Sequence, residues 1–226
     1  WLKNLQRIRP ANPRQKDCSC DVAVVGGGIS GVATSYFLLR DTSLDVMLLE
    51  KDRIAQGATG HNGGQAVAGF EQSLKNLCRL FGEEMVSDGL KAIEGGWDLL
   101  YSMISETGID IDIQEVSASM AFSSIDDVLE ILQERQMLEQ LGIAGGDIIL
   151  AEEVAGKIPD EYRDLFTIKR SDVLADILHT EPGRFICLQK TRMALMNSAF
   201  FCEEIVSWLI ERYPDRFCVF ESTAVQ

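Results

Sequence analysis

The sequence predicts an α/β protein that is built around a βαβ unit with a glycine-rich first turn. Residues 22–25 form a short apolar run, mostly β-branched, which indicates a buried strand. This run breaks into glycines, and apolar positions at helical spacing follow over residues 29–40. A second apolar run, residues 46–49, ends in Glu50. Strand, glycine turn, helix and strand in this order are typical of the first half of a doubly wound, Rossmann-like sheet.

The glycine turn has the spacing of a dinucleotide-binding fingerprint, Gly26-x-Gly28-x-x-Gly31. Gly26 suits the tight turn, Gly28 lets a pyrophosphate approach the backbone, and Gly31 lets helix and strand pack closely. The amino end of the following helix adds N–H groups and positive potential. Glu50 follows the last glycine by about 20 residues, the spacing at which an acid accepts hydrogen bonds from a ribose diol. A glycine-rich turn without a ligand is the alternative interpretation.

The next segments are expected to be a loop and a long helix. Residues 51–65 contain four glycines and small polar side chains, which suit a backbone packed against a flat or phosphorylated ligand. Over residues 83–107, apolar residues recur in steps of three and four, which predicts a helix with one buried face. The pair Gly95-Gly96 in its middle predicts a close crossing by another element.

The pattern changes in the middle of the chain. Alternating apolar residues over 109–114 and a run over 117–123 predict two paired strands. Ser124 then has the spacing of a capping box, which opens a helix that Gly142 ends. Residues 147–150 indicate another short strand, and the segment after it has mixed signals.

A helix over residues 191–213 and a strand over residues 216–221 are predicted next. In a doubly wound sheet, such a strand is expected to return beside the first βαβ unit. The prediction is therefore a nucleotide-binding domain that a second, mixed domain interrupts. The predicted parts are a basic arm at 1–19, the first part of the nucleotide-binding domain at 20–107, the inserted segment at 108–190, and an incomplete second part of the nucleotide-binding domain at 191–226.

Composition restricts the partners. The 226-residue chain carries a net charge of −14 and is 46% hydrophobic, and no apolar run approaches the roughly 18 residues of a membrane span. The first sixteen residues include five bases and no acid, so the remainder of the chain is strongly acidic and disfavours nucleic acid and anionic membranes as partners. We expect the arm to be a solvated leader, because it lacks the apolar core of a signal peptide. Its bases are Lys3, Arg7, Arg9, Arg14 and Lys16.

Six cysteines are scattered along the chain. Only Cys18 and Cys20 lie close in sequence, and this C-x-C pair has no second ligand pair nearby, so we expect no metal site. Buried free thiols are the simplest interpretation of several others, and they favour a reducing, cytoplasmic compartment. The acidic pairs at 126–127, 152–153 and 203–204 lie on helical patterns and are expected to be solvated.

Two blocks of the sequence together resemble the superfamily of FAD-dependent amine and amino-acid oxidoreductases related to D-amino-acid oxidase. This group includes glycine oxidase, sarcosine oxidase and dimethylglycine dehydrogenase. The first block is residues 22–31 with Glu50, which many flavoproteins share. The second and more specific block is Gly-Ala-Thr-Gly-His-Asn-Gly-Gly-Gln at residues 57–65, which is similar to that group's Gly-Ala-Ser-Gly-Arg-Asn-Gly-Gly loop. Family members are longer, and the chain starts at Trp1 without an initiator Met and stops at Gln226, so we expect an amino-terminal fragment.

The resemblance implies a Rossmann-like FAD-binding domain with an interleaved α+β substrate domain, and it implies which residues contact FAD. The glycine turn would line the pyrophosphate, and Glu50 with its neighbour would bind the adenosine ribose. The 57–64 loop would lie along the flavin and its phosphates, and the backbone of Val225 would pair with the adenine edge. No metal ligand and no catalytic residue is assigned. The implied contacts are Gly26, Gly28, Ile29, Ser30, Gly31, Glu50, Lys51, Gly57, Ala58, Thr59, His61, Asn62, Gly63, Gly64 and Val225.

His61 stands where many relatives have Arg. In members similar to dimethylglycine dehydrogenase, a His at the corresponding position carries the flavin covalently. One hypothesis is that His61 does so here, because a neutral imidazole is nucleophilic. The alternative is a loop histidine that only makes hydrogen bonds.

The implied activity is oxidation of the C–N bond of an amino acid or a primary or secondary amine, by hydride transfer to the flavin. A small-molecule amine or amino acid is the implied substrate, and a partner subunit or an electron acceptor completes the implied partners. A truncated or degenerate flavoprotein-fold module without catalysis is one alternative. A tRNA-modifying flavoenzyme, a further member of the superfamily, is disfavoured by the acidic charge balance.

Overall fold

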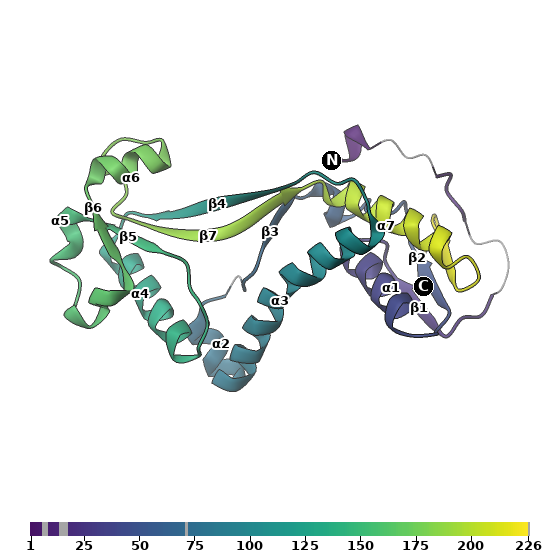
Figure 1. Ribbon diagram of the computed structural model, residues 1–226, viewed down its shortest axis with the longest axis horizontal. Coiled ribbons are helices and arrows are strands. Elements are labelled where there is room, and N and C mark those ends of the chain that lie inside the picture. Colours follow the sequence, from purple (N-terminus) through teal and green to yellow (C-terminus); the bar gives the residue numbers. More distant parts are fainter. Residues whose placement is uncertain (6–8, 14–17, 71, 226) are drawn as a thin grey trace. The chain divides into compact units, whose positions relative to one another are not determined.

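The computed structural model describes residues 1–5, 9–13, 18–70 and 72–225 (Figure 1). Of the arm's basic residues, Arg7, Arg14 and Lys16 lie outside the described residues. The chain divides into two compact units. The first unit comprises Trp1–Ala66, Tyr101–Gln114 and Ala194–Gln226, and the second comprises Val67–Leu100 and Glu115–Met193.

The first unit contains a three-stranded parallel sheet with the strand order β1-β2-β8. Its strands are β1 (Val22–Val25), β2 (Val46–Leu49) and β8 (Phe217–Phe220). In the pairing register, Val46 of β2 lies between Val22 of β1 and Phe217 of β8. The prediction that the last strand returns beside the first βαβ unit is confirmed, and the parallel α/β fold is that of the predicted class.

Two helices of the first unit pack against each other: α1 (Ile29–Asp41) and α7 (Ser198–Arg212). The buried face of α1 consists of Val32, Ser35, Tyr36 and Leu39, as its periodicity predicts. The ring of Tyr36 lies 5.8 Å from that of Trp208 on α7, measured between centroids. Tyr36 is fully buried, whereas Trp208 is half-buried, and full burial of a large apolar side chain stabilises a fold by roughly 1.5–3 kcal/mol.

Strand β1 differs from the prediction of a buried strand. Its residues alternate between half-buried and exposed, and Val25 is 64% exposed. Within the described chain, β1 is the edge strand of its sheet, whereas the central strand β2 is almost fully buried. An apolar run of four residues does not distinguish these two positions.

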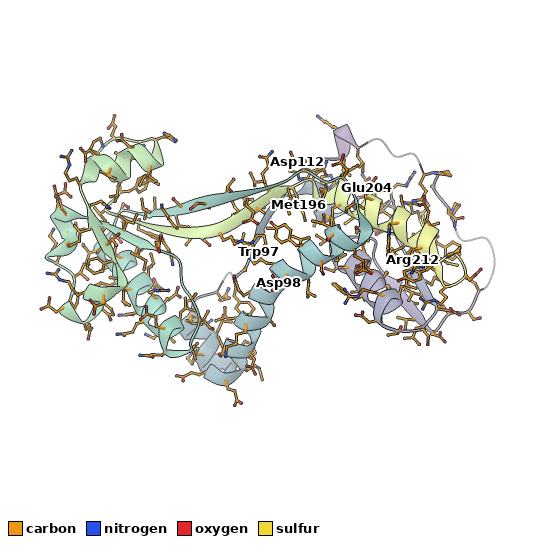
Figure 2. All side chains as sticks on the ribbon, viewed as in Figure 1. Trp97, Asp98, Asp112, Met196, Glu204 and Arg212 are labelled. Carbon is orange, nitrogen blue, oxygen red and sulfur yellow. The ribbon has the colours of Figure 1, made fainter. Side chains whose placement is uncertain are left out.

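The long helix α3 runs from Glu83 to Thr107, as predicted, and is preceded by a shorter helix α2 (Leu74–Phe81) that was not predicted. Ser73 caps α2, because its hydroxyl accepts a hydrogen bond from the Asn76 N–H at 3.4 Å. The expected close crossing at Gly95-Gly96 was wrong, because a Cβ at either glycine would meet no described atom within 4 Å. Trp97 on α3, labelled in Figure 2, lies under the Arg192 guanidinium at 4.4 Å.

A mixed sheet has the strand order β3-β7-β5-β6, and a fifth strand, β4, also pairs with β7. Pairing between β5 and β6 is parallel, whereas that between β5 and β7 is antiparallel. The strands are β3 (Gln65–Val67), β4 (Ile113–Phe122), β5 (Ile148–Ala151), β6 (Thr167–Lys169) and β7 (Cys187–Met196).

Two predictions for these strands were wrong. Two strands were predicted over 109–123, but this segment contains one strand, β4, from Ile113 to Phe122, and residues 109–112 precede it. The predicted helix at 191–213 begins only at Ser198, because the preceding residues pair as β7. Asn197 marks the true helix start, since its side chain accepts a hydrogen bond from the Phe200 N–H at 3.0 Å. Sheet pairing here overrides an apolar pattern that is compatible with a helix.

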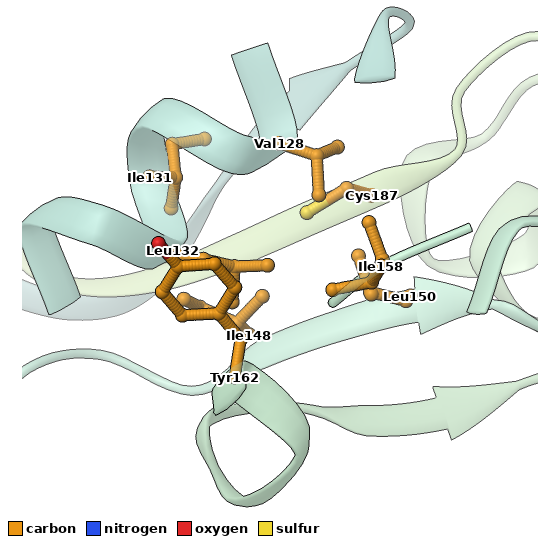
Figure 3. Close-up of a cluster of buried hydrophobic side chains, with 8 residues drawn as sticks. All are labelled: Val128, Ile131, Leu132, Ile148, Leu150, Ile158, Tyr162 and Cys187. Atoms are coloured by element: carbon orange, nitrogen blue, oxygen red, sulfur yellow. The ribbon is translucent and has the colours of Figure 1, made fainter. Parts of the chain in front are cut away.

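The core of the second unit gathers around α4 (Ile125–Gln140) and two strands. The predicted cap of α4 is present, because the Asp127 N–H donates to Ser124 Oγ at 3.1 Å. Short helical segments complete the fold: η1 (Leu2–Asn4), η2 (Ala58–His61), α5 (Glu152–Ala155), η3 (Asp160–Leu165) and α6 (Ser171–Leu178). Figure 3 shows the buried cluster of Val128, Ile131, Leu132, Ile148, Leu150, Ile158, Tyr162 and Cys187.

The six cysteines are free thiols of differing exposure. Cys187 and Cys202 are buried, and burial raises the pKa of each thiol to about 12. Cys18 and Cys218 are exposed, so the expectation of buried thiols holds for only some of them. None of the described helices combines the length and the apolar character that a membrane crossing requires.

Candidate functional site

The glycine turn connects β1 to α1, and its backbone demands glycine at two positions. Gly26 has φ +104°, a conformation that residues with a side chain rarely adopt. A Cβ on Gly31 would lie 1.9 Å from the Gly26 carbonyl oxygen, which is far inside van der Waals contact. The turn therefore brings the first residues of α1 against the end of β1.

The first turn of α1 presents backbone N–H groups that the helix itself does not use. The Ile29 N–H donates to Thr59 Oγ1 at 3.0 Å, and the Val32 N–H makes the first helical bond, to the Gly28 oxygen at 3.0 Å. Within the described residues, the N–H groups of Ser30 and Gly31 have no hydrogen-bond acceptor. Free N–H groups at a helix amino end, with the positive end of the helix dipole, form an anion-binding site.

Glu50 follows β2 directly, and its carboxylate faces the glycine turn. Its Oε2 accepts a hydrogen bond from the Gly27 N–H at 2.6 Å, and its Oε1 accepts one from the Asp52 N–H at 2.8 Å. Only 8% of Glu50 is exposed. Each carboxylate oxygen has two lone pairs, so acceptor capacity remains for ribose hydroxyls.

The 57–64 loop is held by its own hydrogen bonds and by Ser198 at the start of α7. Ser198 Oγ donates to the Thr59 carbonyl at 2.6 Å and lies 3.1 Å from Asn62 Oδ1. Asn62 also bridges the loop, because its Nδ2 donates to the Thr59 carbonyl at 3.0 Å and its Oδ1 accepts from the Gly64 N–H at 2.8 Å. The Gly64 carbonyl accepts from the N–H of Met196, which Figure 2 labels, at 2.9 Å.

His61 lies on the exposed side of this loop. Its Nδ1 is 2.8 Å from the Gly57 carbonyl oxygen. A carbonyl only accepts hydrogen bonds, so the neutral ring carries its proton on Nδ1 and leaves the lone pair on Nε2. Nε2 is thus the nucleophilic nitrogen of the neutral ring.

Glu221, a residue that sequence reasoning missed, orders the segment after Glu50. It is completely buried, and its Oε1 accepts hydrogen bonds from the Ile54 N–H at 2.8 Å and from Arg53 Nε at 3.0 Å. Burial opposes the charged form of Glu221, but hydrogen bonds from Arg9 and the Ile54 N–H outweigh it and lower its pKa. A lone Glu at the end of a strand carries no sequence signal for this role.

The predicted contacts are only partly brought together. Hydrogen bonds link the glycine turn to Glu50 and Thr59. The Thr223 N–H donates to the Glu50 carbonyl at 2.8 Å, so the segment that contains Val225 lies next to Glu50. Val225 itself is 55% exposed. The exposed members of the predicted set include Ser30, Lys51, Gly57, Ala58, His61, Asn62 and Gly63. Within the described chain, no group of three or more His, Cys, Asp or Glu side chains is arranged to hold a metal ion.

Glu203 corrects another expectation, because it is 6% exposed rather than solvated, and its Oε2 lies 3.0 Å from Arg9 Nη2. Arg9 is largely buried too, so the expected solvated leader was wrong at this position. Arg9 and Glu203 lie far apart in sequence, and the local sequence around either residue does not indicate that the two side chains pair.

The chain belongs to the family of FAD dependent oxidoreductases known as DAO, whose family model matches residues 21–189. It is 30% identical over 137 residues to gamma-glutamylputrescine oxidoreductase of Escherichia coli strain K12, a match that covers 60% of this chain and 31% of that protein. It is 36% identical over 63 residues to mitochondrial dimethylglycine dehydrogenase of Rattus norvegicus, which covers 28% of this chain and 7% of that protein. The resemblance to this family is confirmed.

Among solved structures, glycine oxidase from Geobacillus kaustophilus has a similar fold, with a TM-score of 0.58 at 17% sequence identity. The similarity covers 91% of this chain and 47% of that one. The chain thus spans about half of this solved structure and about a third or less of the two curated relatives.

Proposed function

We propose that the chain carries the FAD-binding site of an oxidoreductase that oxidises the C–N bond of an amine or amino acid. The observation that carries the proposal is the placement of the buried Glu50 carboxylate against the glycine turn, beside the free N–H groups of Ser30 and Gly31. When bound, FAD would supply the acceptor for a hydride from the carbon next to the substrate nitrogen.

The residues of the site fit the two polar parts of FAD. The N–H groups of Ser30 and Gly31 suit a pyrophosphate, and Thr59 Oγ1, which would stand 3.0 Å from a Cβ on Gly28, adds a hydroxyl at the same place. Glu50 would accept hydrogen bonds from the adenosine ribose, because a carboxylate offers only acceptors. The 57–64 loop would lie along the flavin, and the Val225 backbone would lie along the adenine.

The substrate class rests on the relatives. Their names specify gamma-glutamylputrescine, dimethylglycine and glycine, each of which contains a nitrogen bonded to a carbon that can lose a hydride. We propose that the substrate contacts come from the segment 108–190 and from parts of the protein beyond this chain. Whether electrons pass to oxygen, a quinone or a partner protein is decided by those parts.

The proposal is tested by FAD titration followed by anaerobic mixing with a panel of amines and amino acids. We expect tight, saturable FAD binding and loss of the long-wavelength flavin absorbance with at least one amine. A protein that does not take up FAD would overturn the proposal. Uptake of FAD without reduction by any amine would leave a flavoprotein-fold module without this activity.

The covalent hypothesis for His61 remains part of the proposal. The Nδ1–H bond to the Gly57 carbonyl leaves the free lone pair on Nε2, which supports a nucleophilic role for that nitrogen. Acid denaturation of the holoprotein separates the cases, since covalent flavin stays with the polypeptide and noncovalent flavin is released.

A further inference from the structure

The first two residues of the chain pack directly on the 57–64 loop. Trp1 Nε1 donates a hydrogen bond to Asn62 Oδ1 at 3.3 Å. A Cβ on Gly64 would lie 2.5 Å from the Trp1 ring, and a Cβ on Gly60 would lie 2.8 Å from the Leu2 side chain. The nearest atoms to these two Cβ positions are backbone oxygens, of Met196 at 2.3 Å and of Ala55 at 2.4 Å, so the loop and the covering segment both leave no room for a side chain here.

The same segment is anchored a few residues later by a buried ionic cluster. Arg9 Nη1 lies 2.8 Å from Glu221 Oε2 and Arg9 Nη2 lies 3.0 Å from Glu203 Oε2, and the three side chains are 16%, 0% and 8% exposed. Arg53 Nη2 also donates to the Arg9 carbonyl at 2.8 Å. A buried ion pair of this kind is weak evidence for net stability, but it defines position, because leaving one charge unpaired is costly.

A second anchor joins the arm to β8. The Glu221 N–H donates to the Asn12 carbonyl at 3.0 Å, and Asn12 Nδ2 donates to the Val219 carbonyl at 3.0 Å. The described parts of the arm, residues 1–5 and 9–13, are thus fixed at both ends.

A continuous set of hydrogen bonds leads from the arm to the glycine turn. Asn62 Oδ1 receives the Trp1 indole N–H, and Asn62 Nδ2 donates to the Thr59 carbonyl. Thr59 Oγ1 in turn accepts the Ile29 N–H at the start of α1. These hydrogen bonds connect Trp1, through Asn62 and Thr59, to the first residue of α1.

We propose that the described residues of the arm, 1–5 and 9–12, form a clasp that holds the 57–64 loop in the conformation that binds FAD. The proposal rests on the proposed function, because it specifies how the same cofactor site is kept ready. Trp1 and Leu2 are positioning residues in this scheme and do not contact substrate. If the loop without its clasp is competent for about a tenth of the time, the apparent dissociation constant rises about tenfold.

The test replaces both contact residues in the intact protein, as Trp1→Ala with Leu2→Ala. Lys3→Ala is the matched control, since Lys3 is exposed on the same short helix. We expect amide hydrogen exchange of residues 57–64 in the FAD-free protein to become about tenfold faster, with an apparent FAD dissociation constant about tenfold higher. The control should match the wild type in both measurements.

Two further measurements separate positioning from general loss of structure. The thermal unfolding midpoint of the double variant should change little, while the visible circular dichroism of bound flavin should change. Trp1→Phe keeps a ring against Gly64 and should restore most of the slow exchange.

Unchanged exchange and an unchanged FAD dissociation constant in the double variant would overturn the clasp. Tighter FAD binding would also overturn it, because Trp1 would then compete with the cofactor. If the wild type takes up no FAD, the proposed function fails, while the exchange of residues 57–64 still decides whether the clasp holds the loop.

Discussion

Replacing Glu50 with Gln removes a buried negative charge that two backbone N–H groups and, in our proposal, a ribose diol share. The carboxylate accepts hydrogen bonds from the N–H groups of Gly27 at 2.6 Å and Asp52 at 2.8 Å, and only 8% of the residue is exposed. Gln has nearly the same shape but a single acceptor oxygen, so it cannot serve both N–H groups.

The magnitude follows from which N–H group loses its acceptor. Gly27 is buried and Asp52 is exposed, so the Gln oxygen should turn toward Gly27 and leave the Asp52 N–H to water. The bond that remains becomes a neutral one, which contributes about 1 kcal/mol instead of about 1.5–3 kcal/mol for a charged acceptor. With the partly exposed second bond lost, we expect the free energy of unfolding of the FAD-free protein to fall by about 2 kcal/mol.

Loss of the charged ribose contact should add a separate effect on binding. One or two hydrogen bonds to a charged acceptor correspond to an increase of about 10- to 100-fold in the FAD dissociation constant. Denaturant unfolding without FAD and FAD titration of the folded variant measure the two effects independently. Asp45→Asn, an exposed acid immediately before β2, is the control and should change neither. Wild-type FAD affinity in the Glu50→Gln variant would refute the assignment of Glu50 to the ribose.

Three other predictions concern single residues. Gly31→Ala should reduce the free energy of unfolding by about 1–3 kcal/mol and weaken FAD binding, because its Cβ would overlap the Gly26 carbonyl, whereas Gly57→Ala, with no atom within 4 Å of its Cβ, should be nearly neutral in denaturant unfolding. Glu221 has a lowered pKa in the folded protein, so its stabilising contribution is present above the usual Glu value of 4.5 and is lost as the pH falls through the folded value. Unfolding measured against pH should therefore lose part of its acid dependence in Glu221→Gln, and an unchanged slope would contradict this. If His61 carries the flavin, acid-denatured wild type should retain flavin on the polypeptide and His61→Ala should release it, while release from both would end that hypothesis.

Local patterns predicted the elements whose structure depends on neighbouring residues. The helix α1, its buried face and the cap at Ser124 follow from spacing within one or two turns, and all three predictions are confirmed. The helix at 191–213 was wrong at its start, because the pairing of residues 187–196 with other strands is decided at long range. Burial of β1 was misjudged for the same reason, since an edge strand and a central strand can have the same composition.

The candidate site also contains residues that local sequence predicts and residues that only long-range contacts bring into place. Strict spacing placed Gly26, Gly31 and Glu50 in advance, because a tight turn needs glycine at a positive φ and a close helix approach excludes a Cβ. Their assignment to FAD remains a prediction for which the measurements above are designed. Ser198 was not found, because its role requires α7 to begin beside the 57–64 loop.

The sequence by itself determined the glycine turn, the acid that follows β2 and the family, since each depends on residue identity and short spacing. Only the tertiary structure decided that Arg9 meets Glu203 and Glu221, and that Trp1 lies on the loop with Asn62. Charges and rings separated by such long stretches of chain meet only after the fold has closed the intervening loops. The closure of these loops depends on burial throughout the fold. A local motif therefore cannot predict which distant partner each residue contacts.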